Sequence, residues 1–226
     1  SIGQAVNLPE GATQVQGGSV LAVLDPAAGL LWVGNADEPA SISFAAEDAV
    51  AKDLSDGVVT VSRTGTVFAY SAGSSSLVTV VKEGQTWRAK TSVIKDFQPS
   101  GPLSMTAVGD KPVIYDQSGN TLVLPGGKLR DLAEEHVTGA VLQDPGDEAA
   151  SVLLATDSEL VAVSLNGKSV ERQPASDAGA KGNPAAPVFH NGCSYGAWAG
   201  SGAFVRTCTD KSRNQAQTVP TLAETT

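Results

Sequence analysis

Short apolar runs alternate with polar turn residues along the whole chain. The clearest example lies between Ser151 and Lys168, where the apolar runs 152–155 and 160–163 flank the polar segment 156–159. Two apolar runs of strand length around a short polar turn are typical of a β-hairpin. Similar patterns occur at four further places, so the sequence predicts a protein built mainly from strands.

The spacing of these hairpins predicts how the strands are organised. The turn centres lie near residues 27, 64, 118, 157 and 201, which gives intervals of 37, 54, 39 and 44 residues. Blades of a β-propeller repeat about every 40–50 residues and hold four strands each. The sequence therefore predicts an all-β, β-propeller-like fold with about five visible four-stranded blades. A pair of β-sandwiches and a solenoid are the alternatives, and the period favours the propeller.

Several segments are assigned within this scheme. The whole chain, 1–226, is interpreted as a single domain and as a fragment of a larger protein, with closure of the ring left open. Ser41–Phe44 is predicted to be a short strand, and residues 90–102 are interpreted as an insertion. Lys128–His136 is compatible with two helical turns, although a connecting turn is preferred.

The two cysteines are predicted to form a disulfide bond. If Gly200-Ser201 forms a two-residue type II′ turn, Ala199 faces Gly202, and counting outward places Cys193 opposite Cys208. Directly opposed strand residues lie within disulfide range. The alternative is a pair of buried free thiols. A disulfide predicts an oxidising, extracytoplasmic location.

Composition and charge narrow the classes of partner. Hydrophobic residues make up 41% of the chain and charged residues 17%, and 24 Gly and 12 Pro indicate a turn-rich globular protein. The net charge is −9 and no cluster of Lys or Arg stands out. Nucleic-acid binding is therefore not expected. No run of 18 apolar residues occurs, so membrane insertion by this segment is not expected either.

Motifs for metal, cofactor or nucleophilic chemistry are not found. The two histidines, His136 and His190, are far apart and form no zinc-binding spacing. His190 is a candidate for a channel-facing residue, but a structural or surface role is preferred. No G-x-S-x-G or Walker motif is present. The sequence predicts no catalytic, cofactor-binding or metal-binding residues.

Acidic residues are candidate catalytic groups because propeller glycosidases use carboxylates near the channel. The candidates are Asp25, Asp116, Asp144, Asp147 and Asp157. Asp25, Asp116 and Asp157 are predicted to occupy the same place in their hairpins. A recurrent Asp at a turn is better explained by hydrogen bonds to nearby backbone N–H groups. The segment 116–120 resembles the start of a calcium loop, and a turn is preferred there as well.

Aromatic residues are candidates for a binding face, although most are expected to pack between blades. They are Trp32, Trp87, Trp198, Tyr70, Tyr115 and Tyr195. Trp87 ends the segment 84–87, which matches only the last residues of the motif that repeats in sialidase-type propellers. This partial match is interpreted as coincidental. Tyr195 is predicted to lie opposite Arg206, as a local stack or as part of a ligand site.

Two resemblances to known families add to this interpretation. Pro184-Ala185-Ala186-Pro187-Val188 and the cysteine hairpin that follows resemble the N-terminal region of large actinomycete cell-surface proteins with fibronectin type III or immunoglobulin-like modules. This resemblance implies a propeller-like ectodomain placed after a membrane anchor, with no catalytic residues to transfer. Hairpins such as 115–122 resemble the quinoprotein and YVTN class of propeller repeats. That class implies a redox cofactor, but the quinone-contacting residues and the vicinal cysteine pair are missing, so no cofactor is expected.

These observations favour a non-catalytic, extracytoplasmic binding or scaffold module with a protein or carbohydrate ligand. Inter-strand loops on one face would form the recognition surface. The alternative is a propeller-type carbohydrate hydrolase or lyase, which needs two or more carboxylates that converge on the channel. A structural spacer without a large pocket is a third option.

Overall fold

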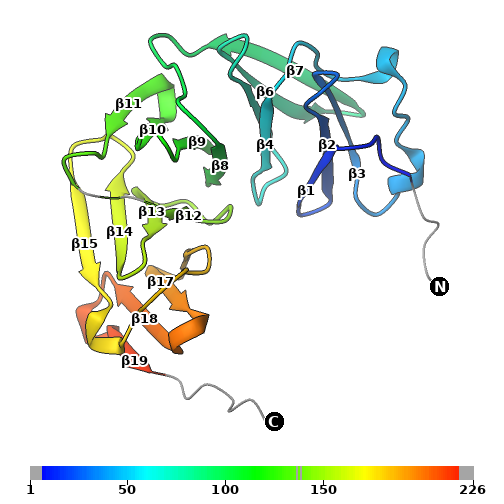
Figure 1. Cartoon of the computed structure of the whole chain (residues 1–226). Helices are drawn as coiled ribbons and strands as arrows, with labels where there is room; N and C mark the ends of the chain where they lie inside the picture. The colour runs from blue at the N-terminus through cyan, green and yellow to red at the C-terminus, as the bar shows by residue number, and fades with distance from the viewer. Residues whose placement is uncertain (1–6, 136, 138, 219–226) are drawn as a thin grey trace, which may run out of the picture. The chain divides into compact units, whose positions relative to one another are not determined.

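The computed structural model describes residues 7–135, 137 and 139–218, which consist almost entirely of strands and turns. Five antiparallel sheets follow one another in chain order, each a meander in which consecutive strands pair (Figure 1). The chain divides into two compact units, Ser1–Pro99 with Met105–Pro112 and Ser100–Ser104 with Val113–Thr226. No helix among the described residues is long and apolar enough to cross a membrane.

The first two sheets belong to the first unit. Sheet 1 contains β1 (Thr13–Gly17), β2 (Val20–Asp25) and β3 (Leu30–Asn35), and sheet 2 contains β4 (Gly57–Val61), β5 (Val67–Ser71), β6 (Ser76–Glu83) and β7 (Thr86–Val93). Two 3-10 turns, η1 (Pro39–Ser41) and η2 (Ala46–Asp48), lie between the two sheets in sequence.

The remaining three sheets have four strands each. Sheet 3 contains β8 (Leu103–Val108), β9 (Lys111–Asp116), β10 (Thr121–Leu124) and β11 (Lys128–Asp131). Sheet 4 contains β12 (Val141–Leu142), β13 (Ser151–Ala155), β14 (Glu159–Ser164) and β15 (Val170–Pro174). Sheet 5 contains β16 (Val188–His190), β17 (Cys193–Trp198), β18 (Ala203–Cys208) and β19 (Gln215–Thr218). Short 3-10 turns occur at η3 (Pro125–Gly127), η4 (Ser176–Ala178), η5 (Ala199–Ser201) and η6 (Lys211–Arg213).

Three sequence-based assignments need correction. Sheet 1 has three strands rather than four, because the predicted strand at 41–44 is part of a loop that also includes η1 and η2. The supposed insertion at 90–102 begins inside β7, which sequence reasoning missed. Lys128–Asp131 forms the strand β11 rather than a helix or turn. No side chain of the outer strands β7 and β11 is fully buried, so their sequences lack the apolar alternation by which a strand is recognised.

A recurring turn joins the second and third strands of successive sheets. In sheets 1, 2 and 3 four residues separate these strands, and the last of them has a positive φ: Gly29 (69°), Ser75 (51°) and Asn120 (51°). The backbone carbonyl of each residue accepts a hydrogen bond from a buried residue beyond its sheet's last strand. The donors are the N–H groups of Leu54, Ile94 and Leu132, at 2.9–3.0 Å.

Sheet 4 makes the same bond from a shorter turn, where the N–H of Ala175 donates to the carbonyl of Ser158 at 2.8 Å. We call this bond the backbone latch. It recurs in four sheets, and each time it ties the segment that leaves the sheet to the turn at the sheet's end.

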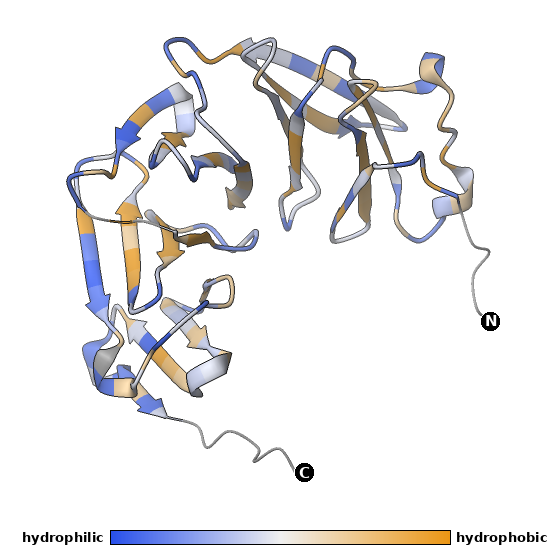
Figure 2. Ribbon diagram, viewed as in Figure 1, coloured by the Kyte–Doolittle hydropathy of each residue, from blue (hydrophilic) through white to orange (hydrophobic). Residues whose placement is uncertain are grey.

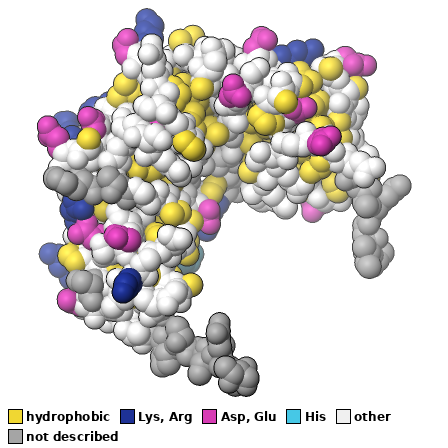
Figure 3. Space-filling model, in the orientation of Figure 1, with side chains coloured by type: hydrophobic (Ala, Val, Ile, Leu, Met, Phe, Trp, Pro, Cys, Tyr) yellow, Lys and Arg dark blue, Asp and Glu magenta, His cyan; other side chains and the backbone are white. Residues whose placement is uncertain are grey.

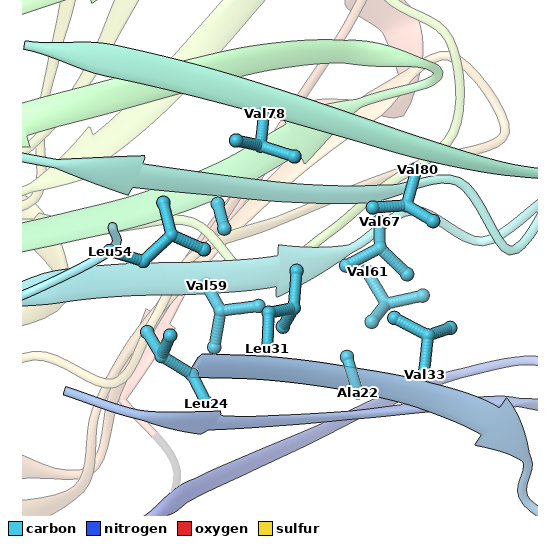
Figure 4. Close-up of a cluster of buried hydrophobic side chains, with 11 residues drawn as sticks. Ala22, Leu24, Leu31, Val33, Leu54, Val59, Val61, Val67, Val78 and Val80 are labelled. Atoms are coloured by element: carbon cyan, nitrogen blue, oxygen red, sulfur yellow. The ribbon is translucent and has the colours of Figure 1, made fainter. Parts of the chain in front are cut away.

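The core of the first unit lies between sheets 1 and 2. Figure 4 shows Leu24 and Leu31 from sheet 1 pointing toward Val59 and Val61 from sheet 2. The sheets approach so closely at Gly17 that an added Cβ would collide with the carbonyl oxygen of Ser62. Glycine at this position therefore permits the packing of one sheet on the other.

The core of the second unit includes a cluster shared by sheets 4 and 5. Trp198 is fully buried there with Leu153, Leu160 and Val205. Its indole N–H donates to the carbonyl of Thr156 at 2.8 Å, which satisfies the only polar atom of the side chain. In Figure 2 the inner strand β14 is mainly hydrophobic whereas the outer strand β15 is mainly hydrophilic, in accord with the burial of their side chains.

The predicted disulfide bond between Cys193 and Cys208 is present. The two residues are directly paired in the ladder of β17 and β18, with a Cα–Cα distance of 4.0 Å. The turn differs from the expectation, because Trp198 pairs with Ala203 and Gly202, not Gly200, has the positive φ. A symmetric widening of the turn leaves the register unchanged, so the predicted pairing was correct although the predicted turn was wrong.

A carboxylate connects two turns of the first unit. Asp110, between β8 and β9, accepts hydrogen bonds from the hydroxyl groups of Ser62 (2.7 Å) and Thr64. Ser62 is fully buried, and its Oγ in turn accepts from the N–H of Thr66 at 3.0 Å. The hydrogen bond from Thr64, assisted by that from Ser62, lowers the pKa of Asp110 from its usual value of 3.8.

This shift predicts how Asp110 contributes to acid stability. A carboxylate with a lowered folded-state pKa stabilises the fold above its unfolded pKa of 3.8, and the contribution is lost as pH falls through the lower folded value. Asp110→Asn should therefore be less stable than the parent protein at pH 7, and the difference should shrink below pH 3.8. Urea unfolding across this range measures the effect, with the exposed Glu10→Gln as the matched control. A pH-independent difference would contradict it.

The disulfide predicts a loss of stability on reduction. It closes a sequence separation of 15 residues, for which the chain-entropy model gives about 3 kcal/mol. The Cys193→Ala, Cys208→Ala variant and the reduced parent protein should both unfold at lower urea concentration than the oxidised parent. Mass spectrometry without reductant should show the linked peptides in protein exported to an oxidising compartment. Equal stability of the oxidised and reduced parent would refute the prediction.

Candidate functional site

A groove in the first unit forms where the sheets depart from the repeated pattern. Sheet 1 lacks a fourth strand, and the segment 36–49 takes that place as a loop with η1 and η2. Sheet 2 departs in the opposite direction, because β6 and β7 have eight residues each whereas the outer strands β11, β15 and β19 have four or five. The loop and the end of this long hairpin line the same cavity of about 450 Å³.

We call this cavity the hairpin groove. Its lining residues are Trp32–Asn35 from β3, Ser41, Ile42, Ser43 and Asp48 from the loop, and Lys82, Gln85 and Trp87 from the hairpin. Strand β3 thus contributes one side of the groove, the loop a second and the hairpin a third. Segments that are some fifty residues apart in sequence therefore supply its polar groups.

The loop wall is held by specific contacts with β3. The indole N–H of Trp32 donates to the carbonyl of Ala45 at 2.9 Å, and its ring packs edge-on against Phe44 with the centroids 5.5 Å apart. Ile42 fills the space above Gly34, where any Cβ would collide with its side chain. These contacts fix the loop wall before any ligand binds, which lowers the entropy lost on binding.

The hairpin wall presents an indole ring and a cation together. Trp87 pairs directly with Lys82 in the β6–β7 ladder, and the Lys82 ammonium lies 5.6 Å from the centroid of its ring. Trp87 also packs against the core cluster of sheets 1 and 2 and remains partly exposed, whereas the other outward residues of β7 are exposed. The core contact positions the ring, and its partial exposure makes it available to a ligand.

The other tryptophans and tyrosines proposed as binding-face residues have structural positions. Trp32 is only 3% exposed and Trp198 is fully buried. Tyr70 is buried beside Phe97, with ring centroids 5.7 Å apart, and Tyr115 donates its hydroxyl to Asn120 Oδ1 at 2.9 Å. Burial raises the pKa of both tyrosine hydroxyls.

Tyr195 does lie opposite Arg206, as predicted. Its ring, however, packs near Phe204, with centroids 6.2 Å apart, and Arg206 donates its Nε–H to the carbonyl of Arg213 at 2.8 Å. The two side chains therefore have partners of their own, and they do not line the hairpin groove.

Two of the candidate carboxylates organise turns, as expected. Asp25 Oδ1 accepts from the N–H groups of Ala27 and Ala28 at 2.9 Å. Asp116 occupies the equivalent position in sheet 3, is almost fully buried, and accepts from the backbone N–H groups of Ser118 and Gly119. These bonds account for both carboxylates as structural groups.

Asp157 was wrongly placed in this series. The equivalent position belongs to Thr156, whose Oγ1 accepts from the N–H groups of Ser158 (3.3 Å) and Glu159 (3.0 Å). Asp157 is exposed one residue further along and accepts a hydrogen bond from the Ser158 hydroxyl at 2.9 Å. Asp144 is likewise exposed. Figure 3 shows acidic side chains dispersed over the visible face rather than gathered at one point.

His190 forms an Asp–His pair that sequence reasoning did not identify. Its Nδ1 lies 3.1 Å from Asp147 Oδ2, and its Nε2 lies 2.9 Å from the side-chain nitrogen of Asn191. In the tautomer that donates from Nδ1 to Asp147, Nε2 is an acceptor and receives the Asn191 amide proton. Both ring nitrogens are thus engaged on the surface of sheet 5. His136 lies outside the described residues.

Further cavities occur between sheets 4 and 5 of the second unit. One cavity, of about 280 Å³, has Leu153, Phe189 and Cys208 in its lining, and another, of about 130 Å³, has Arg172 in its lining. Glu171 is the only carboxylate among the described residues lining either cavity. Over the described part of the chain, no group of three or more His, Cys, Asp and Glu residues could hold a metal ion.

Comparison with known proteins identifies the fold. No family model matches the chain, and no curated protein matches its sequence. Among solved structures, the chain is similar to a streptogramin B lyase, with a TM-score of 0.57 and 12% sequence identity over 89% of this chain and 66% of that one. It is also similar to a catalytically inactive variant of virginiamycin B lyase from Staphylococcus aureus with quinupristin, with a TM-score of 0.58 and 10% identity over 96% of this chain and 72% of that one. A structure of a nidogen/laminin complex is similar with a TM-score of 0.51 and 9% identity, over 91% of this chain and 79% of that one.

These similarities establish an all-β fold of the β-propeller type, which the spacing of the hairpins predicted. The chain spans about two thirds of the first lyase, 66% of its length. At 9–12% identity the similarity concerns the fold alone.

The loop wall predicts the effect of one small substitution. Gly34→Ala should displace Ile42, lower the free energy of unfolding and alter the environment of Trp32, because the added methyl group occupies the space of the Ile42 side chain. The expected loss is about 1–3 kcal/mol, measured by urea unfolding and near-ultraviolet circular dichroism. Gly73→Ala is the matched control, since its Cβ would meet only Ser71 Oγ, at 3.9 Å. Equal behaviour of the two variants would contradict the packing described.

Proposed function

We propose that this chain is a non-catalytic binding module that acts outside the cytoplasm as part of a cell-surface protein, and that the hairpin groove is its binding site for a carbohydrate. The observation that carries the proposal is that both departures from the repeated sheet pattern, the loop 36–49 and the long β6–β7 hairpin, meet at this groove. Places where a chain breaks its own structural pattern are often functional sites.

The lining of the groove supports a carbohydrate ligand. Saccharides present hydroxyl groups that donate and accept hydrogen bonds, and C–H surfaces that pack on aromatic rings. The groove supplies the Trp87 ring, the side-chain amides of Asn35 and Gln85, and the hydroxyl groups of Ser41 and Ser43. Its volume falls in the range of about 300–1,000 Å³ that is usual for small-ligand sites.

The alternative is a propeller-type carbohydrate hydrolase or lyase. Such a hydrolase would use two carboxyl groups about 5–10 Å apart on either side of the sugar. Asp48 is the only carboxylate among the described residues that line the hairpin groove. Asp25 and Asp116 hold their hairpin turns through two backbone N–H groups each. The positions of these carboxylates favour binding over hydrolysis.

The proposed location follows from the chemistry of the disulfide. Disulfides persist in oxidising compartments and are rare in the cytosol of most organisms. Cys193 and Cys208 are both buried, which fits a structural bond rather than an exposed redox centre. The resemblance of the segment 184–208 to actinomycete surface proteins supports the same location.

Binding should be visible in tryptophan fluorescence, because Trp87 is the only one of the three tryptophans that is not buried. Titration with neutral, acidic and amino disaccharides should give a saturable change for at least one of them. Trp87→Ala should weaken that binding about tenfold or more, the equivalent of about 1.4 kcal/mol, as measured by calorimetry because this variant lacks the fluorescent side chain. Thr91→Ala, an exposed position on the same strand outside the groove, should leave it unchanged.

Two outcomes would count against the proposal. Absence of binding to all three classes of saccharide would refute a carbohydrate ligand. Release of new reducing ends or of unsaturated products from a bound saccharide would replace the binding module with the hydrolase or lyase alternative.

A further inference from the structure

The two walls of the hairpin groove carry opposite charges. The loop wall, residues 36–49, contains no Lys or Arg but four acidic residues, which are Asp37, Glu38, Glu47 and Asp48. The hairpin wall, residues 81–93, contains three basic residues, Lys82, Arg88 and Lys90, and one acidic residue, Glu83. In a chain with a net charge of −9, this hairpin is a local region of positive charge.

One charged residue from each wall lines the cavity itself. Asp48 belongs to the loop side and Lys82 to the hairpin side. Glu83, the acidic residue of the hairpin, is paired with Arg88 at 3.4 Å, so the Lys82 ammonium is not neutralised by this neighbour. Among the described residues, no ion pair involves Asp48 or Lys82. Their charges are therefore available to a molecule in the groove.

Building on the proposed carbohydrate site, we infer that the hairpin groove selects a saccharide that carries both an amino group and an acidic group. The amino group binds at Asp48, and the acidic group binds at Lys82. A charged hydrogen bond is stronger than a neutral one when water is displaced, so each wall favours one ligand charge. Each wall also disfavours the opposite arrangement through like-charge repulsion.

Trp87 and the amide side chains fix the sugar ring between these two ends. Trp87 lies directly opposite Lys82 across the two strands, so an acidic substituent at Lys82 places the adjoining sugar ring beside the indole. The groove therefore distinguishes ligands by charge at its ends and by ring shape in the middle. A neutral saccharide satisfies only the middle of the groove.

Four disaccharides with one scaffold test this inference. The scaffold is glucosamine linked to glucuronic acid, and the probes combine a free or N-acetylated amine with a free or reduced carboxyl group. The disaccharide with both free groups should bind most tightly. Acetylation of the amine or reduction of the carboxyl group should each weaken binding about tenfold, the usual scale for a lost charged hydrogen bond. Affinities are measured by calorimetry or Trp87 fluorescence at fixed low salt.

Variants assign each ligand charge to its wall. Asp48→Asn should weaken binding only of the two probes with a free amine, and Lys82→Gln only of the two with a free carboxyl group. Lys82→Arg should restore most of the affinity for the carboxyl probes. Glu47→Gln and Lys90→Gln, neighbours that do not line the groove, are the matched controls for long-range charge effects and should change affinity little.

The outcomes separate this inference from the proposed function. Equal binding of all four disaccharides would overturn the charge selection while leaving a carbohydrate site. Sensitivity of both probe pairs to both variants alike would show a general field rather than two separate ends, and would also overturn it. Failure of all four to bind, together with no binding in the wider saccharide titration, would remove the carbohydrate site itself.

Discussion

The structure depends on the need of each sheet to be covered on both faces. All five residues of β5 are buried, and four of the five residues of β13 are buried, so successive side chains that point to opposite faces are both removed from water. A single meander of three or four strands cannot provide that environment. Sheets must therefore pack in series, as sheet 1 packs on sheet 2 and sheet 4 on sheet 5. The hairpin groove opens where this regular packing gives way to a loop.

The inner strands of this fold could be predicted from sequence, whereas the outer strands β7 and β11 could not. Strands such as β13 and β14 are apolar runs between turn residues, which is the strongest signal that a single sequence offers. The strand β7 has one partly buried residue, Trp87, among exposed ones, so nothing in its pattern separates it from a loop. Residues 41–44 show the opposite case, because two apolar residues in alternation give this loop the pattern of a strand.

The candidate site shows the same division between local and long-range information. Trp87 was recognised as a candidate aromatic residue, but its neighbours in the groove, Asn35, Asp48 and Lys82, were not. No local motif connects them, because they come from β3, the loop and the hairpin and meet only through the packing of sheet 1 on sheet 2. A useful signal was present in the acidic segment 36–49, which breaks the repeat at the place where a fourth strand was expected. The disulfide, in contrast, depended on one local register and was predicted correctly.

The backbone latch has a consequence for how such a chain can evolve. Its donor and acceptor are both main-chain atoms, so the bond places no chemical demand on either side chain beyond tolerance of the turn and burial of the donor. Gly29, Ser75 and Asn120 all serve as acceptors, and Ala175 serves as a donor where the other sheets use Leu or Ile. Substitutions can accumulate at these joints without loss of the architecture. A fold joined in this way can retain its shape long after its sequence has ceased to resemble that of its structural neighbours.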